Sequence, residues 1–151
     1  MYLYETHLAV NDVSVSQSFY SEVVGLPFAF RDPKRDIVFL WIGDDRRSML
    51  GLWGPGTEFG RVRGRCHLAI AVTVPELLIA GKRLNELGVA TRNFTNDATT
   101  EPSVIGWMPS AQLYFDDPDG HLLEFIALLD DEPDAGFIGA LGEWQTRRGA
   151  R

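Results

Sequence analysis

The sequence predicts an α+β fold built from two βαβββ modules. The motif His7-Leu8-Ala9-Val10 recurs almost unchanged as His67-Leu68-Ala69-Ile70, which indicates an internal repeat. In each motif, apolar and other side chains alternate as in a strand, and the following segment has the apolar spacing of a helix. Strand-like segments follow each helix. We therefore expect a curved sheet that carries the helices on its outer face and forms a cleft on the other.

The length and composition point to one domain with a tail. The chain has 151 residues, of which 45% are hydrophobic and 23% are charged, as in ordinary globular proteins. We expect a single domain over residues 1–130, with modules at about 1–60 and 61–130, and a C-terminal tail over 131–151. The formal net charge of -7 argues against a nucleic-acid-binding surface.

The sequence gives no sign of export or membrane insertion. No stretch approaches the roughly 20 apolar residues that span a bilayer, and the N-terminus lacks the basic and apolar segments of a signal peptide. Cys66 is the single cysteine, which rules out an internal disulfide and fits a reducing compartment. Its thiol is expected to face the helix side as an inert core group. We therefore expect a cytoplasmic protein.

The first module is predicted to run from a strand at Glu5–Val10 through a helix to three strands. Asn11 or Asp12 offers the N-cap of the helix, and Gly25 stands where a left-handed C-terminal cap belongs. The three strands are expected at about 27–31, 36–42 and 48–53. The expected apolar stripe of the helix comprises Val15, Phe19 and Val23, with Tyr20 and Val24 beside them.

The second module repeats this order after a linker rich in glycine and arginine. Its first strand, Cys66–Val72, leads into a capping box in which Thr73 is followed by Glu76. Weaker strands near 89–93 and 104–108 and clearer ones at 111–115 and 122–128 come after the helix. The tail is expected to hold a short helix at 135–144. The helix of the module is expected to bury Leu77, Ala80, Leu84 and Leu87 and to end at Gly88.

Strand alternation places three polar side chains on the face that the helices leave uncovered. His7, His67 and Glu124 each lie opposite apolar neighbours along their strands. Two imidazoles and one carboxylate match the facial ligand set of a divalent transition metal with open coordination positions, such as Fe, Mn, Zn, Ni or Co. We therefore expect these three residues to meet on one divalent metal ion.

Simpler roles remain open for the same residues. A lone histidine in a strand is commonly a hydrogen-bonding residue. A carboxylate in so apolar a strand needs a partner, and an ion pair of Glu124 with Arg65 or Arg92 would supply one. The remaining histidine, His121, follows the turn Asp117-Pro118-Asp119-Gly120 and is expected at the surface.

Four sequence motifs resemble those of a known family. They are His7-Leu-Ala-Val-Asn-Asp, Phe19-Tyr20-Ser-Glu-Val-Val-Gly25-Leu-Pro-Phe28, His67-Leu-Ala-Ile and Tyr114-Phe-Asp-Asp-Pro-Asp-Gly-His-Leu-Leu-Glu124. Together, over about residues 4–128, they resemble the vicinal oxygen chelate superfamily, which holds glyoxalase I, bleomycin-resistance proteins, fosfomycin-resistance thiol transferases, extradiol dioxygenases and methylmalonyl-CoA epimerase. The resemblance implies paired βαβββ modules, a cleft holding a divalent metal, and a homodimer, often with each site built from both subunits.

The resemblance assigns the metal ligands to His7, His67 and Glu124. A fourth position belongs near Leu50-Gly51-Leu52, where glyoxalase I has a glutamate that acts as ligand and base. Here it aligns to Gly51, and Met49–Trp53 contains no acid or amide. This departure argues against the glyoxalase I reaction, which needs a carboxylate to move a proton between adjacent carbons.

Two other branches of the superfamily match in part. Extradiol dioxygenases use further histidines near the bound oxygen, whereas this chain has three histidines in all. The fosfomycin-resistance branch places a tyrosine ten residues before the glutamate, where Tyr114 stands. That branch also expects a threonine where Ala9 stands, and a lysine and an arginine that bind phosphonate, for which Arg92 is the nearby candidate.

The sequence thus predicts a divalent-metal-dependent enzyme, a lyase, isomerase or transferase, that polarises an oxygen of a small oxygen-rich substrate. Tyr114 would assist by donating a hydrogen bond or a proton. Trp107, Met108 and Arg92 would line the substrate pocket. The alternatives are a metal-free, ligand-sequestering protein of the bleomycin-resistance kind and an extradiol-type dioxygenase.

Overall fold

The computed structural model describes residues 1–62 and 64–149, which form two compact units. The first unit comprises residues 1–66 together with 117–121, and the second comprises residues 67–116 and 122–151. Each unit holds one sheet, with four strands in the first and five in the second. In chain order each unit begins with a strand, a helix and three strands, and in the second unit one more strand and a helix follow, so the predicted α+β fold of two βαβββ modules is confirmed.

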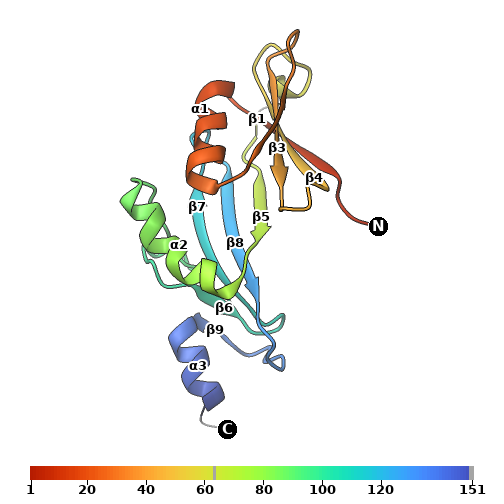
Figure 1. The fold of residues 1–151 in the computed structure, drawn as a ribbon. Coiled ribbons are helices and arrows are strands. Elements are labelled where there is room, and N and C mark those ends of the chain that lie inside the picture. The colour runs from red at the N-terminus through yellow and green to blue at the C-terminus, as the bar shows by residue number, and fades with distance from the viewer. Residues whose placement is uncertain (63, 150–151) are drawn as a thin grey trace. The chain divides into compact units, whose positions relative to one another are not determined.

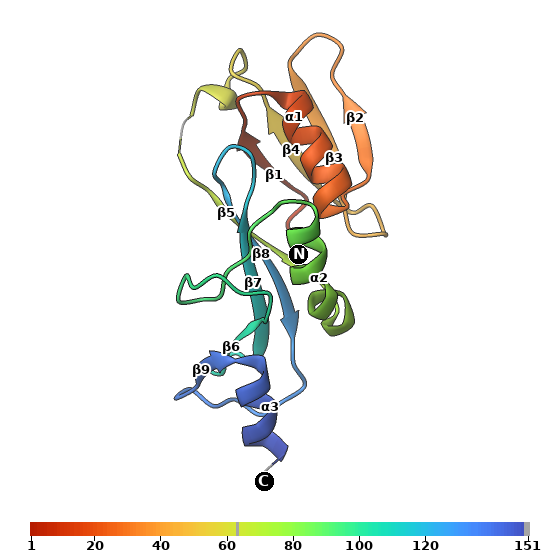
Figure 2. The same ribbon diagram turned by 90° about the vertical axis from the view of Figure 1, so that its left-hand side faces the viewer.

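The sheet of the first unit, drawn in Figure 1, has the strand order β1-β4-β3-β2, and all four of its strands are labelled in Figure 2. Its strands are β1 (Glu5–Ala9), β2 (Phe28–Arg31), β3 (Ile37–Ile42) and β4 (Ser48–Trp53). β1 runs parallel to β4, and the other pairs are antiparallel. The parallel pair is possible because the helix between β1 and β2 carries the chain back across the sheet.

The first helix begins at an aspartate cap and ends at a glycine, as predicted. Asp12 accepts hydrogen bonds from the amides of Ser14 and Val15, and α1 (Val13–Ser18) passes into a π-helical turn, η1 (Phe19–Val24). Gly25 then adopts a left-handed conformation with φ of 94°, which costs glycine little. The helix packs on β3 and β4 (Figures 1 and 2).

The buried face of this helix agrees with the predicted apolar residues only at Tyr20 and Val24. Val15 is 54% exposed, whereas the buried positions are Val13, Ser16, Tyr20 and Val24. The two hydroxyl groups are tolerated inside because the turn at residues 117–121 supplies acceptors: Ser16 Oγ donates to Asp119 Oδ2 at 2.9 Å and Tyr20 Oη donates to Asp117 Oδ2 at 2.8 Å. An apolar pattern does not reveal such partners.

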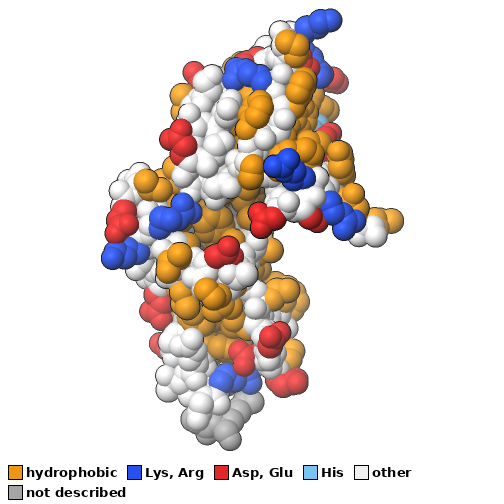
Figure 3. Space-filling model, in the orientation of Figure 1, with side chains coloured by type: hydrophobic (Ala, Val, Ile, Leu, Met, Phe, Trp, Pro, Cys, Tyr) orange, Lys and Arg blue, Asp and Glu red, His pale blue; other side chains and the backbone are white. Residues whose placement is uncertain are grey.

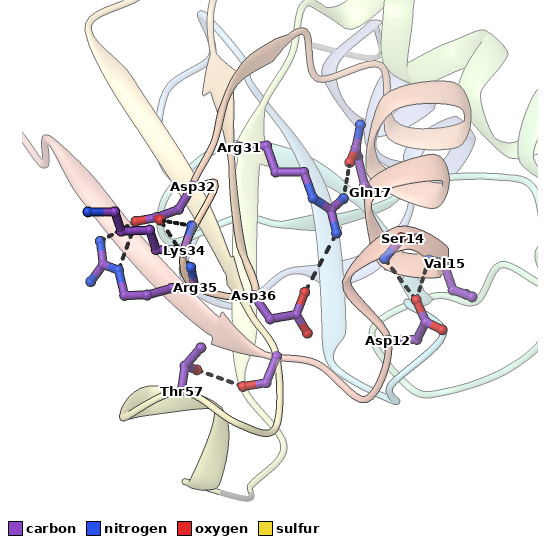
Figure 4. Close-up of polar contacts among 11 residues, drawn as sticks. Asp12, Ser14, Val15, Gln17, Arg31, Asp32, Lys34, Arg35, Asp36 and Thr57 are labelled. Atoms are coloured by element: carbon purple, nitrogen blue, oxygen red, sulfur yellow. Dashed lines mark hydrogen bonds and ion pairs between the residues drawn. The ribbon is translucent and has the colours of Figure 1, made fainter.

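A carboxylate organises the turn between β2 and β3 (Figure 4). Asp32 Oδ1 accepts from the amides of Lys34 and Arg35 at 2.8 and 3.0 Å, and Arg35 Nε donates to Oδ2 at 2.8 Å. These bonds, led by that from Lys34, hold the pKa of the Asp32 carboxyl below its ordinary value. Arg31 joins the hairpin to α1 through Gln17 Oε1 at 3.2 Å.

The sheet of the second unit has the order β5-β8-β7-β6-β9. Its strands are β5 (His67–Ala71), β6 (Ser103–Ile105), β7 (Ser110–Asp116), β8 (Leu122–Leu128) and β9 (Ile138–Ala140). β5 runs parallel to β8, and the other pairs are antiparallel. This repeats the arrangement of the first unit, with β9 as an additional strand.

The second helix, α2 (Val74–Glu86), packs on β7 and β8. Its predicted capping box is present, because Thr73 accepts from the amide of Glu76 while the Glu76 carboxylate accepts from the amide of Thr73. Leu77, Ala80 and Leu84 are buried as expected. Leu87 is instead 52% exposed, because it stands at the C-cap, where the apolar stripe has left the sheet.

Two weaker predictions about this unit are wrong. The segment 89–93 forms no strand, since Arg92 makes only isolated bridges to Ala98 and Tyr114. The helix predicted at 135–144 is replaced by β9, paired antiparallel with β6, and α3 (Leu141–Gly149). Gly136, Gly139 and Gly142 weaken a helix over the predicted span. Residues 150 and 151 of the tail lie outside the described residues.

The surface carries charges of both signs. On the face drawn in Figure 3, basic and acidic side chains are interspersed rather than gathered into one basic patch. Across residues 1–62 and 64–149, none of the helices has the length and apolar character needed to cross a membrane.

Candidate functional site

The second unit brings His67, Glu124 and Tyr114 together on one face of its sheet. Ala69 and Tyr114 flank Glu124 on the neighbouring strands. His67 Nε2 lies 3.0 Å from Glu124 Oε2, and the Tyr114 hydroxyl hydrogen-bonds to the same carboxylate. Glu124 is only 6% exposed, whereas half of the His67 side chain is accessible. A buried carboxylate is thus paired with an accessible imidazole.

Burial dominates the electrostatics of this cluster. It raises the pKa of the Glu124 carboxyl, and the charge of His67 and the hydrogen bonds from His67 and Tyr114 oppose that rise. The pKa of Tyr114 is raised by burial and then by the charge of Glu124. The tyrosine therefore stays protonated at neutral pH and donates to the carboxylate. A buried carboxylate of this kind gains from a bound cation.

The sequence left open an ion pair between Glu124 and Arg92. In the structure Arg92 pairs with Asp116 instead. Its guanidinium donates to both oxygens of Asp116, at 2.9 and 2.7 Å. Sequence reasoning missed Gln112, two residues before Tyr114 on the same face. Gln112 is wholly buried, and its Oε1 has no hydrogen-bond partner among the described residues.

The other predicted pocket residues lie in the turn between β6 and β7. Trp107 is 63% exposed and Met108 is 36% exposed. A cavity of about 130 Å³ opens elsewhere in this unit, between the segment 93–103 and β9, and neither Trp107, Met108 nor Arg92 lines it. Their role in a substrate pocket therefore stays a prediction.

The first unit places His7 in an aromatic setting. Its ring centroid lies 4.8 Å from Trp53, 5.2 Å from Phe59 and 6.2 Å from Phe39. His7 Nε2 points to Glu5 Oε1 at 3.1 Å. Packing among rings fixes the imidazole, so that one ring nitrogen is presented to a carboxylate on the same face of β1.

Gly51 pairs directly with His7 in the sheet. A Cβ atom at this glycine would lie 2.8 Å from His7 Cδ2, 2.8 Å from Trp53 Nε1 and 3.1 Å from Phe39 Cε1. The space that a side chain would need is therefore filled by three rings. The position at which the resemblance expects a fourth ligand is closed by packing as well as empty of a carboxylate.

His121 was expected at the surface, and that expectation is wrong. It is only 3% exposed. Its Nδ1 accepts from the amide of Cys66 at 3.1 Å, and its Nε2 faces the carbonyl of Ala9 at 2.9 Å. An amide only donates and a carbonyl only accepts, so the ring is neutral with its proton on Nε2. Cys66, expected in the core, is exposed because it precedes β5.

The predicted metal ligands are divided between the units. The second unit brings His67 and Glu124 together, and His7 belongs to the first. Within residues 1–62 and 64–149, the structure holds no group of at least three His, Cys, Asp or Glu side chains arranged for a metal ion. What each unit offers is one imidazole beside one carboxylate, a donor combination that suits divalent transition metals.

Comparison with known proteins gives a family match and several similar folds. The family model described as Glyoxalase/Bleomycin resistance protein/Dioxygenase superfamily matches residues 3–125. No curated protein sequence matches the chain significantly. An integron cassette protein from the mobile metagenome of the Halifax Harbour sewage outfall is 30% identical, with 84% of this chain and 98% of that chain covered and a TM-score of 0.68.

Two further solved structures resemble the chain in fold. Lactoylglutathione lyase from Agrobacterium tumefaciens is 22% identical, with 83% of this chain and 92% of that chain covered and a TM-score of 0.63. Oxidase ChaP-H2 is 19% identical, with 90% and 98% covered and a TM-score of 0.64. At these identities the likeness concerns the fold alone.

Proposed function

The chain belongs to the glyoxalase/bleomycin resistance protein/dioxygenase superfamily, and from that premise we propose that it is a divalent-metal-dependent enzyme acting on a small oxygen-rich molecule. His7, His67 and Glu124 would bind the ion. The metal is one of the borderline divalent ions that imidazole and carboxylate suit: Fe, Mn, Zn, Ni or Co. The reaction is that of a lyase, isomerase or transferase.

The observation that carries this proposal is the pairing of the buried Glu124 carboxylate with the accessible His67 imidazole. Two donors bound at adjacent octahedral positions, each about 2.1 Å from the ion, lie about 3.0 Å apart, and the two side chains are separated by 3.0 Å. Burial raises the pKa of Glu124, so the ionised form gains from a cation. The donor types, their spacing and the buried charge all fit a divalent metal.

The protein's own groups have distinct tasks in this proposal. Tyr114 orients Glu124 through its hydrogen bond and keeps its proton, because burial raises its pKa. The rings around His7 fix that imidazole. A bound divalent ion would polarise a substrate oxygen and stabilise the negative charge that develops there.

The activities of the similar structures do not transfer equally well. Gly51 argues against a lactoylglutathione lyase reaction that depends on a carboxylate at that position, because the rings of His7, Trp53 and Phe39 occupy the space. An extradiol oxygenase needs further histidines near bound oxygen. The remaining histidine of this chain, His121, is neutral and buried between an amide and a carbonyl, which argues against that branch.

Metal analysis tests the proposal. Protein purified without chelator is expected to carry about one divalent ion per chain. Glu124→Gln should lose it, whereas Glu86→Gln, a change of an exposed glutamate on α2 in the same unit, should keep it. Absence of metal from the wild type, together with full ligand affinity in His67→Ala, would overturn the proposal and favour a metal-free sequestering protein. Oxygen uptake with a catechol would favour the oxygenase.

We also propose that the protein acts as a homodimer in which each site combines His7 of one subunit with His67 and Glu124 of the other. The superfamily resemblance supports this arrangement. Mixing His7→Ala with His67→Ala chains tests it, because each mixed dimer then regains one intact site. An equal mixture should recover about a quarter of the wild-type metal content. No recovery after verified subunit exchange would show that each site uses ligands of a single chain.

A further inference from the structure

The first unit contains a second carboxylate beside a predicted metal ligand. Glu5 stands two residues before His7 on β1, so both side chains lie on the same face of the strand. Glu5 Oε1 lies 3.1 Å from His7 Nε2. The Glu5 side chain is 39% exposed and the His7 side chain is 22% exposed, which leaves the pair accessible to an ion.

The neighbouring strand leaves no room for another donor beside His7. Its partner on β4 is Gly51, and a Cβ there would lie 2.8 Å from an atom of the His7 ring and from Trp53 Nε1. Both contacts are with rings held by further rings. Within the sheet of the first unit, the carboxylate next to His7 is therefore that of Glu5, the acid in β1.

The geometry of the pair repeats that in the second unit. His67 Nε2 and Glu124 Oε2 are 3.0 Å apart, and His7 Nε2 and Glu5 Oε1 are 3.1 Å apart. Both values match the separation of about 3.0 Å expected for two donors bound at right angles to one ion. Each unit of the internal repeat thus presents one imidazole nitrogen and one carboxylate oxygen at the spacing of adjacent ligands.

We infer that Glu5 binds the same divalent metal ion as His7, as a fourth protein ligand. This inference rests on the proposed function, since it requires that the protein binds a metal. It replaces the carboxylate that the superfamily pattern expects at Gly51 by one on the adjacent strand. With Glu5 included, the donor set has two imidazoles and two carboxylates, and a divalent ion bound by two carboxylates forms a centre without net charge.

A hydrogen bond between Glu5 and His7 would have the same length, so the experiment has to separate a ligand from an ion-pair partner. Glu5→Gln keeps the size and the hydrogen-bonding capacity of the side chain but removes its charge. Glu22→Gln, in the exposed part of the π-helical turn of the same unit, is the matched control. Zn²⁺ affinity is measured by competition with a chromogenic chelator, and the Co²⁺-loaded proteins are compared by visible absorption.

The inference predicts that Glu5→Gln lowers Zn²⁺ affinity by about 10–100-fold and changes the Co²⁺ absorption bands, because the ion loses a ligand. Glu22→Gln should match the wild type in both measurements. Zn²⁺ affinity of Glu5→Gln within about twofold of wild type, or unchanged Co²⁺ bands, would overturn the role of Glu5 and leave the proposed function intact. Failure of the wild type to bind either ion would overturn both.

Discussion

Gly51→Ala tests whether the packing around His7 closes the fourth ligand position. The added Cβ would lie 2.8 Å from His7 Cδ2, 2.8 Å from Trp53 Nε1 and 3.1 Å from Phe39 Cε1. Three ring contacts at such distances require shifts in a well-packed region, which cost about 1–3 kcal/mol. The loss of backbone freedom in the unfolded chain offsets about 0.4–1 kcal/mol. We expect a net loss of about 1–2 kcal/mol.

Urea unfolding measures this loss, with Gly56→Ala as the control. Gly56 has nothing within 4 Å of its Cβ position, so its substitution should be neutral or stabilising by up to about 1 kcal/mol. With a denaturant slope of about 2 kcal/mol per molar urea, Gly51→Ala should lower the unfolding midpoint by about 0.5–1 M. Equal midpoints for the two variants would refute the claim that the rings close this position.

Three further substitutions test contacts outside the metal ligands. Tyr20→Phe removes the donor to Asp117 Oδ2 at 2.8 Å and should cost about 1–3 kcal/mol in urea unfolding; wild-type stability would contradict the buried bond. Thr73→Ala should cost about 1 kcal/mol through the lost N-cap. Hydrogen bonds from Thr73 hold the pKa of Glu76 below its ordinary value of 4.5, so their stabilisation is present above that value and is lost as pH falls through the lowered pKa. Lowering the pH from about 5 to about 3 should therefore reduce the free energy of unfolding less in Thr73→Ala than in the wild type. Parallel pH profiles of the two proteins would contradict this. His121→Ala removes two part-buried hydrogen bonds, to the Cys66 amide and the Ala9 carbonyl, which should cost about 1–3 kcal/mol together; a thermal midpoint equal to that of wild type would contradict the two bonds.

Local signals in the sequence predicted most of the fold. Asp12, Thr73 with Glu76, Gly25 and Gly88 mark helix ends through contacts within a few residues, and each is found in that role or conformation. Strand alternation likewise placed the first strands of both modules. These features depend on neighbours in the chain, so a pattern reveals them directly.

Features that depend on partners distant in the chain could not be predicted from the sequence pattern. Ser16 and Tyr20 are buried in α1 because aspartates about a hundred residues later accept their hydrogen bonds. The glycine-rich tail forms a strand because β6 offers it a free edge. His121 looked like a turn residue because its partners, at Ala9 and Cys66, are remote in the sequence.

The candidate site was predictable in part. Alternation along β8 singled out Glu124, and the structure pairs it with His67. Whether His7 joins them stays a prediction, as does the catalytic role of Tyr114. Glu5 was overlooked, although its spacing of two residues from His7 already placed both on one face. Its significance emerges only with the measured distance and the closed space at Gly51.

The turn at residues 117–121 has a consequence for biosynthesis. It belongs to the first unit, yet the ribosome makes it long after residue 66. At about 5–20 residues per second, the first unit waits roughly 3–11 seconds for its acceptors. During that interval the hydroxyls of Ser16 and Tyr20 lack the carboxylates that accept from them. A nascent chain stalled before Asp117 should therefore be sensitive to protease and bind chaperones, although all its strands from β1 to β4 have been synthesised.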